Sequence, residues 1–359
     1  MRENRIGSLD SLRAIAALGV LWIHAWTKFG NPRLHLFGVD ITSILALGGN
    51  GVDLFFVISG FSIFYFYSSD IPLSFKMYGK FLLKRWRRLS FAFYSLTAVY
   101  IIWLYYVGDH NLIIARSLTS IFYLNSIFPE FNADVSFWSI GVEWQFYLIA
   151  PIIFYLQHKI GFKKALLFNS CLMGIISIGL VIVLKKESDI YVQQISFRYF
   201  EFVSGILLAK ILLRKNQKIV SSTNILLTSL IITYLGRVFI SEPILNLSSN
   251  YYNLFKLVGF LIMGSGFSGI IYSIITSKGY IKSFFENSKL GYLGRISYSF
   301  YLLHGIVLAI TAHYFKLILT TASFWNPVIV FITCSAVLIP LSSLSYYLLE
   351  VPITKFKKR

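Results

Sequence analysis

Ten long apolar runs, separated by short polar segments, dominate the pattern of this 359-residue sequence. A helix needs about 20 mostly apolar residues to cross the hydrocarbon core of a bilayer. The runs are approximately that long, so the pattern predicts an all-α, polytopic membrane protein with ten transmembrane helices in one domain, residues 1–359. The predicted helices cover residues 9–28, 48–68, 89–107, 138–157, 165–184, 193–213, 222–240, 254–277, 296–315 and 326–349.

An eleventh apolar run, near residues 112–128, is shorter than the others and has Arg116, Pro129 and Glu130 at or near its ends. Charged residues are costly in the hydrocarbon core, and proline ends or kinks a helix. We therefore expect a re-entrant or interfacial segment here instead of an eleventh crossing.

The placement of basic residues predicts the orientation of the helices. The chain has 33 Lys and Arg against 15 Asp and Glu, a formal net charge of +18. With a cytoplasmic N-terminus and ten crossings, 22 basic residues fall in cytoplasmic segments and six in outer segments, as the positive-inside rule requires. We therefore expect both termini to be cytoplasmic, in the inner (plasma) membrane.

Composition narrows the class of protein further. Hydrophobic residues make up 56% of the chain and charged residues only 13%, which excludes an ordinary soluble enzyme. The basic residues are scattered over short loops, a distribution that argues against a nucleic-acid partner. The two cysteines, Cys171 and Cys334, lie inside apolar runs, so no disulfide framework is expected.

Ionisable residues inside the first apolar run are the first candidates for chemistry. Arg13 and His24 are eleven residues apart, which places them about 16 Å apart on nearly the same face of a helix. His24 is either a packed histidine or a catalytic one. Asp10 and Arg13 are at i and i+3, so they can also simply neutralise each other.

The second run begins with glycines at 48, 49 and 51, which allow close helix approach in a membrane. Asp53 follows about one turn into this run and needs a buried partner. It is either a hydrogen-bonded carboxylate on a packing face or a catalytic group.

Arg85 and Arg88 precede the third run and share one helix face. Guanidinium groups bind phosphate oxygens in a bidentate geometry, so the pair could hold a phosphorylated ligand from the cytoplasm. The alternative is that these residues only anchor a helix end against anionic lipid.

Other polar residues occur in later runs. Glu143 lies about one turn into the fourth run, where it could be a base, could orient an imidazole or could pair with a buried arginine. Arg198 and Glu201 form an i, i+3 pair that we expect to be structural. His304 and Glu350 are weaker candidates.

Six stretches together resemble the acyltransferase-3 family of integral membrane acyltransferases, which modify surface glycans, lipids and some small molecules. They occur in family order and cover nearly the whole chain. One departure is Ser90-Phe91 after the arginine pair, where the family often has proline. The stretches are LDSLRAIAALGVLWIH (9–24), GVDLFFVISGF (51–61), the Arg85/Arg88 pair, FWSIGVEWQFYLIAP (137–151), ISYSFYLLH (296–304) and EVP (350–352).

The resemblance implies roles for individual residues. It makes His24 the essential histidine and Arg13 its partner. It links Arg85 and Arg88 to acyl-coenzyme A, and it places Glu143 at the family's acidic position. It implies no metal. Supporting residues expected from the same stretches are Asp10, Asp53, Ser139, Tyr298 and His304.

These observations give an O-acyltransferase hypothesis. An acetyl group would pass from cytoplasmic acetyl-CoA to a hydroxyl of a cell-envelope or exported glycan, for example a lipid-linked sugar, with His24 as general base or acetyl carrier. A transporter or flippase of glycan intermediates, or a scaffold in which His24 is only packed, are the alternatives. The sequence leaves the acceptor (O-antigen of lipopolysaccharide, capsule or exopolysaccharide) and the oligomeric state open.

Overall fold

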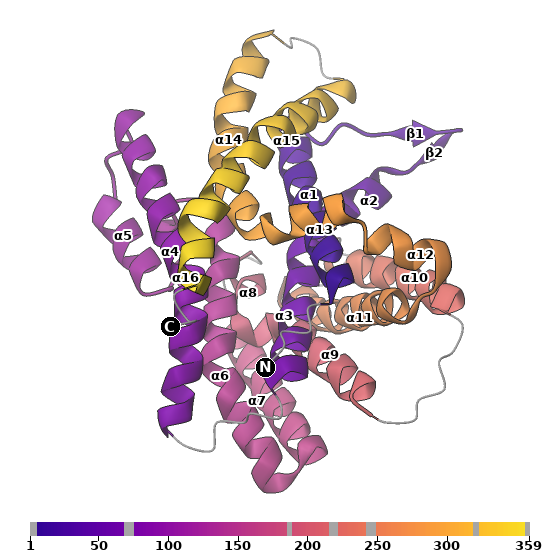
Figure 1. Cartoon of the computed structure of the whole chain (residues 1–359). Coiled ribbons are helices and arrows are strands. Elements are labelled where there is room, and N and C mark those ends of the chain that lie inside the picture. Colours follow the sequence, from indigo (N-terminus) through magenta and orange to yellow (C-terminus); the bar gives the residue numbers. More distant parts are fainter. Residues whose placement is uncertain are drawn as a thin grey trace. The chain divides into compact units, whose positions relative to one another are not determined.

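The computed structural model describes residues 6–67, 75–184, 189–214, 222–241, 249–318 and 323–355. Long helices occur at all ten predicted positions (Figure 1). They are α1 (Gly7–Lys28), α3 (Gly51–Tyr67), α4 (Phe75–Tyr106), α6 (Trp138–Ile160), α7 (Phe162–Leu184), α9 (Ile195–Leu212), α10 (Ser222–Ser241), α11 (Ser249–Thr276), α14 (Ser297–Ile318) and α15 (Trp325–Ser345).

Short elements connect these helices. The only strands among the described residues are β1 (His35–Leu36) and β2 (Val39–Asp40), which pair antiparallel. The short helical elements are α2 (Thr42–Leu45), η1 (Ala46–Asn50), α5 (Ile113–Ile121), η2 (Pro129–Phe131), η3 (Val135–Phe137), α8 (Asp189–Val192), α12 (Gly279–Phe285), α13 (Ser288–Arg295), η4 (Tyr346–Glu350) and α16 (Val351–Lys355).

Eight of the described helices are long and apolar enough to cross a membrane: α3, α4, α6, α7, α10, α11, α14 and α15. Helices α1 and α9 are the other two predicted crossings. Both are at least 18 residues long, but ionisable side chains such as Arg13 and Arg198 interrupt their apolar runs. The predicted all-α, polytopic membrane fold is confirmed, and the orientation of the termini stays a prediction. Terminal basic residues used in that prediction, among them Arg2, Arg5 and Arg359, lie outside the described residues.

Two predicted boundaries are informative. Helix α4 begins at Phe75 rather than at residue 89, so Arg85 and Arg88 lie inside the third helix and not in a loop before it. Lysine and arginine are good helix formers, and a polar run therefore continues a helix that hydropathy alone would end. The run near 112–128 forms only the nine-residue helix α5, which is too short to cross a bilayer.

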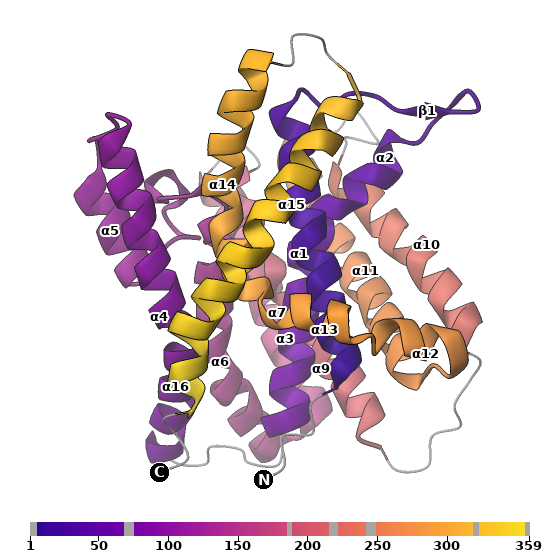
Figure 2. The same ribbon diagram turned by 45° about the horizontal axis from the view of Figure 1, so that its top comes forward.

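The chain divides into two compact units, and the first comprises Met1–Val52, Ser90–Tyr106 and Ser277–Arg359. Helix α1 is its centre and packs against α13, α14 and α15 (Figures 1 and 2). Gly19 and Gly48 allow the closest approach of α1 to η1, since a Cβ added at Gly19 would lie 2.8 Å from the carbonyl oxygen of Gly48. The predicted role of the glycine stretch in close packing is confirmed at this contact.

The end of α15 continues into a π-helical turn, η4, and then into α16. Glu350, the last residue of that turn, accepts a hydrogen bond of 2.6 Å from the hydroxyl of Ser299 on α14. The Ser299 hydroxyl also lies 2.8 Å from that of Ser345. The turn is thus fastened to α14 by polar contacts within the first unit.

The second unit comprises Asp53–Leu89 and Val107–Thr276. Helix α9 packs against α6, α7 and α11, and α10 lies alongside α11 in both views (Figures 1 and 2). Phe202 of α9 stacks on Phe56 of α3 and Phe146 of α6, with ring centroids 4.8 and 4.0 Å apart. Gly60 has no side chain where α3 meets the backbone of Phe202, and a Cβ there would overlap it.

Candidate functional site

Helix α1 carries the predicted pair of opposite charges near its N-terminus. A terminal nitrogen of Arg13 lies 3.2 Å from Oδ1 of Asp10, as the i, i+3 spacing predicts. Asp10 is buried, and its backbone lies against Gly294 of α13, where any Cβ would overlap it. Arg13 is half-buried. The ion pair lies on α1, the helix that also carries His24.

His24 contacts a second histidine, His304, which belongs to the C-terminal segment of the first unit. Its Nδ1 lies 2.9 Å from Nε2 of His304 on α14, and the two rings stack with centroids 5.0 Å apart at 24°. His304 is only 1% exposed, and its Nδ1 bonds to the backbone carbonyl of Tyr301. The structure therefore joins two residues of the predicted set that are 280 positions apart.

A further predicted residue, Tyr298, lies on α14, the helix that also carries His304. Tyr298 is half-buried and precedes Ser299, the residue that bonds to Glu350. The family stretches ISYSFYLLH and EVP therefore meet through a Ser299–Glu350 hydrogen bond. This contact gives Glu350 a structural task in anchoring the π-helical turn.

Arg85 is the centre of a separate polar and aromatic cluster in the second unit. The side chain is buried, and its guanidinium carbon lies 4.6 Å from the ring centroid of Tyr67, 5.4 Å from that of Tyr147 and 5.5 Å from that of Phe81. Its Nε has no hydrogen-bond partner among the described residues. Arg88 is exposed, so the two arginines of the predicted pair occupy different environments.

Glu143 of α6 belongs to the same cluster. The hydroxyl groups of Ser59 and Tyr147 both donate to its Oε1, the former at 3.2 Å. Ser139, one turn earlier, uses its hydroxyl to bond the carbonyl of Ser136 at 3.2 Å. Glu143 is thereby linked through Tyr147 to the surroundings of Arg85, whereas Ser139 supports the start of the helix.

Asp53 forms a buried ion pair with Arg198. One terminal nitrogen of Arg198 lies 2.5 Å from Oδ1 of Asp53 and 3.2 Å from Oε1 of Glu201. The guanidinium also covers the ring of Phe260 at 4.0 Å. The predicted Arg198–Glu201 pair is confirmed. Asp53 joins it in a buried ion-pair network, which favours the packing interpretation of this carboxylate.

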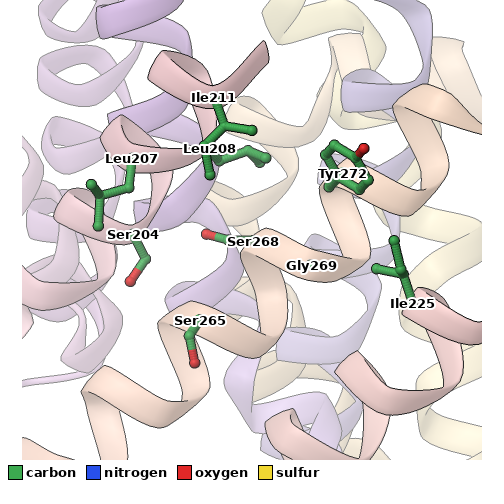
Figure 3. A pocket seen from close by; sticks show the side chains of 9 residues that line it. All are labelled: Ser204, Leu207, Leu208, Ile211, Ile225, Ser265, Ser268, Gly269 and Tyr272. Carbon is green, nitrogen blue, oxygen red and sulfur yellow. The ribbon is translucent and has the colours of Figure 1, made fainter. Parts of the chain in front are cut away.

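A cavity of about 540 Å³ opens in the second unit between α9, α10 and α11 (Figure 3). Leucine, isoleucine and serine side chains line it together with Gly269 and Tyr272, and none of the predicted site residues is among them. Its lining residues are Ser204, Leu207, Leu208, Ile211, Ile225, Ser265, Ser268, Gly269 and Tyr272.

Some contributors to these clusters were missed in the sequence. Tyr147 follows Glu143 by four residues, a spacing that places both on one helix face and was available as a signal. Tyr67 and Ser59 are separated from their partners by helix packing and had no such signal. Among the described residues, no group of three or more His, Cys, Asp or Glu side chains is arranged to hold a metal ion.

The fold and the two clusters define a multi-pass membrane protein. One unit contains a pair of histidines, and the other contains a buried arginine surrounded by aromatic rings. The chain belongs to the acyltransferase-3 family, because the family model described as an acyltransferase domain matches residues 6–347. The resemblance stated from the sequence is confirmed.

Curated relatives cover the chain at low identity. OatA of Listeria monocytogenes, named a peptidoglycan O-acetyltransferase, is 25% identical over 98% of this chain and 56% of its own length. YrhL of Bacillus subtilis, named as a candidate peptidoglycan O-acetyltransferase, is 26% identical over 97% of this chain and 55% of its own length. ORF330 of Acidianus two-tailed virus, named as a candidate acetyltransferase, is 31% identical over 48% of this chain and 49% of its own. The chain thus spans about half the length of these relatives. No solved structure matches it significantly.

Proposed function

We propose that this protein is an O-acetyltransferase of the inner (plasma) membrane that transfers an acetyl group from acetyl-CoA to a hydroxyl of a cell-envelope glycan. The observation that carries this proposal is the ring-to-ring bond between His24 and His304 inside an acyltransferase-3 chain. A histidine held in this way suits proton transfer better than a merely packed one, because its second nitrogen is aimed by the first.

The chemistry assigned to His24 is general-base catalysis. Its imidazole takes the proton of the acceptor hydroxyl while that oxygen attacks the thioester carbonyl carbon. The C–S bond then breaks, and the coenzyme A thiolate leaves and takes up a proton. Transient acetylation of the imidazole, followed by transfer to the hydroxyl, is the second route open to the same residue. Arg13 would orient the ligand or stabilise the negative charge that develops on the thioester oxygen.

Arg85 and Arg88 are the proposed holders of the donor. Coenzyme A carries phosphates, and guanidinium groups bind phosphate oxygens strongly. The buried Nε of Arg85 has no hydrogen-bond partner among the described residues, and aromatic rings contact its guanidinium group. Both features suit a cation that binds an anionic ligand. Exposed Arg88 would add a second contact at the surface. Since Glu143 bonds to Ser59 and Tyr147, we propose that it supports this donor cluster.

The names of the relatives bear on the acceptor. Two are named for peptidoglycan O-acetylation, so peptidoglycan is the first glycan to test, ahead of O-antigen, capsule or exopolysaccharide. We also propose that the two compact units work as one acyltransferase domain, an assignment supported by the single family model that spans both.

Labelled acetyl-CoA tests the function directly. Membranes containing the wild-type protein should transfer label to envelope glycan, and His24→Ala and Arg85→Ala should abolish or strongly reduce this transfer at equal protein level. His313→Ala on α14 and Arg87→Ala on α4 are matched controls, because both side chains are exposed. Transfer retained in His24→Ala would refute the catalytic assignment. Glycan movement that needs no acetyl-CoA, with no labelled product, would instead indicate a transporter.

A further inference from the structure

We propose that His304 is a positioning residue that fixes the tautomer of His24, so that Nε2 of His24 is the basic nitrogen. This inference rests on the proposed acyl transfer and adds a second histidine to it. A series of hydrogen bonds runs from the Tyr301 carbonyl through His304 to His24.

This series of hydrogen bonds begins at the carbonyl oxygen of Tyr301, which can act only as an acceptor. A backbone carbonyl oxygen only accepts hydrogen bonds, so Nδ1 of His304, which bonds to the carbonyl of Tyr301, must carry a hydrogen. A neutral imidazole has one N–H, and its other nitrogen is then an acceptor. When the buried His304 ring is neutral, its Nε2 therefore accepts.

The second link follows from the first. Nδ1 of His24 lies 2.9 Å from that acceptor and must supply the hydrogen between the two rings. In neutral His24 the lone pair then resides on Nε2. The first link is local, because the Tyr301 carbonyl lies on the same helix as His304, three residues earlier.

The arrangement also suits the charged state that catalysis would create. When Nε2 of His24 takes a proton, Nδ1 keeps its hydrogen and continues to donate to His304. The bond between the rings becomes charge-assisted, and such bonds are stronger than neutral ones. His304 would thus hold the ring in position before the proton transfer and stabilise the imidazolium after it.

The surroundings hold His304 in place. The ring is 1% exposed, the ring of Tyr301 lies 5.2 Å away, and the backbone N–H of Ile306 donates to the hydroxyl of Tyr100 at 2.7 Å. A packing role alone would require the volume of His304 but not an acceptor atom. Substitutions that keep volume and change only the acceptor therefore separate the two roles.

Kinetics with labelled acetyl-CoA provide the first test. In membranes with native envelope acceptor, His304→Leu should lower the apparent kcat by about 10²-fold or more, because acid–base catalysis contributes about 10²–10⁴-fold. The KM for acetyl-CoA should stay within about twofold of wild type, because the inferred task of His304 is at the proton-transfer step. His304→Gln, whose amide oxygen can accept from His24, should recover most of the kcat. His313→Leu is the matched control.

The opposite results are equally clear. Wild-type kcat in His304→Leu would overturn the inference, as would equal loss in the Leu and Gln variants with folded protein. If the wild-type protein itself transfers no label, the proposed function fails instead, and a measurement without turnover is needed.

Solid-state ¹⁵N NMR of histidine-labelled protein in bilayers gives that measurement. At pH 8, well above the ordinary imidazole pKa of about 6.5, the His24 signals, assigned by their loss in His24→Asn, should show hydrogen on Nδ1. In His304→Leu the His24 population should shift toward hydrogen on Nε2. An Nε2-protonated His24 in the wild-type protein would overturn the inference whatever the enzyme's substrate.

Discussion

The guanidinium of Arg85 lies 5.4 Å from the ring centroid of Tyr147, and the hydroxyl of that same tyrosine donates to Glu143. One aromatic side chain therefore contacts the cation through its face and the carboxyl group through its oxygen. The distinction allows the two contacts to be removed separately.

Arg85→Lys should raise the KM for acetyl-CoA by about tenfold or more. A lysine keeps the charge but loses the planar group that lies over Tyr67 and can bind phosphate through two nitrogens. Steady-state kinetics with varied acetyl-CoA measure this effect. Arg87→Lys on the same helix should leave KM unchanged, and an unaltered KM in Arg85→Lys would remove this arginine from the donor site.

Tyr147→Phe should lower the free energy of unfolding by about 1–3 kcal/mol while the KM for acetyl-CoA changes little. The variant removes a hydrogen-bond donor from Glu143 but keeps the ring beside Arg85. Thermal unfolding of detergent-solubilised protein is the measurement, with exposed Tyr155→Phe as the control. A large KM increase with unchanged stability would show that the hydroxyl contacts the donor instead.

Gly60→Ala should destabilise the second unit by about 1–3 kcal/mol, since the new methyl group would overlap the backbone of Phe202. Melting temperature and the monodisperse fraction in size-exclusion chromatography report the effect. Gly174→Ala on α7 is the control, because its Cβ would have no neighbour within 4 Å. Equal melting temperatures for both variants would contradict the close α3–α9 contact.

Arg198→Met should cost about 3–5 kcal/mol, because it leaves the Asp53 and Glu201 carboxyl groups buried without their shared cation. Adding Asp53→Asn and Glu201→Gln to that variant should recover much of the stability, since no buried charge is then left uncompensated. Denaturation midpoints of the single and triple variants test this. Absence of recovery would mean that the guanidinium acts chiefly by covering Phe260.

Much of the fold follows from the sequence because a bilayer demands long apolar helices at any position that crosses it. The ten runs gave the positions of the ten long helices within a few residues at most ends. The main exception is the start of α4 at Phe75, where basic residues extend a helix beyond its apolar part. Hydropathy indicates which part of a helix lies in the apolar core of the bilayer. It does not indicate how far the helix continues into water.

The site was only partly predictable for a related reason. Asp10 and Arg13 pair through local helix geometry, so their spacing was sufficient. His24 and His304 are 280 residues apart, and Asp53 and Arg198 are 145 apart. Such pairs depend on which helices become neighbours, and the apolar pattern of a membrane helix says little about its neighbours because nearly every face is apolar.

The π-helical turn at Tyr346–Glu350 adds one residue to the regular repeat of the last long helix. Each residue of an α-helix turns the chain by about 100°, so the insertion rotates everything after Ser345 by that angle. Glu350, the last residue of this turn, accepts the hydrogen bond of Ser299. Deleting a single residue there would preserve the helix but rotate the carboxyl group by about a quarter-turn away from Ser299. The number of residues in this turn therefore matters as much as their identity.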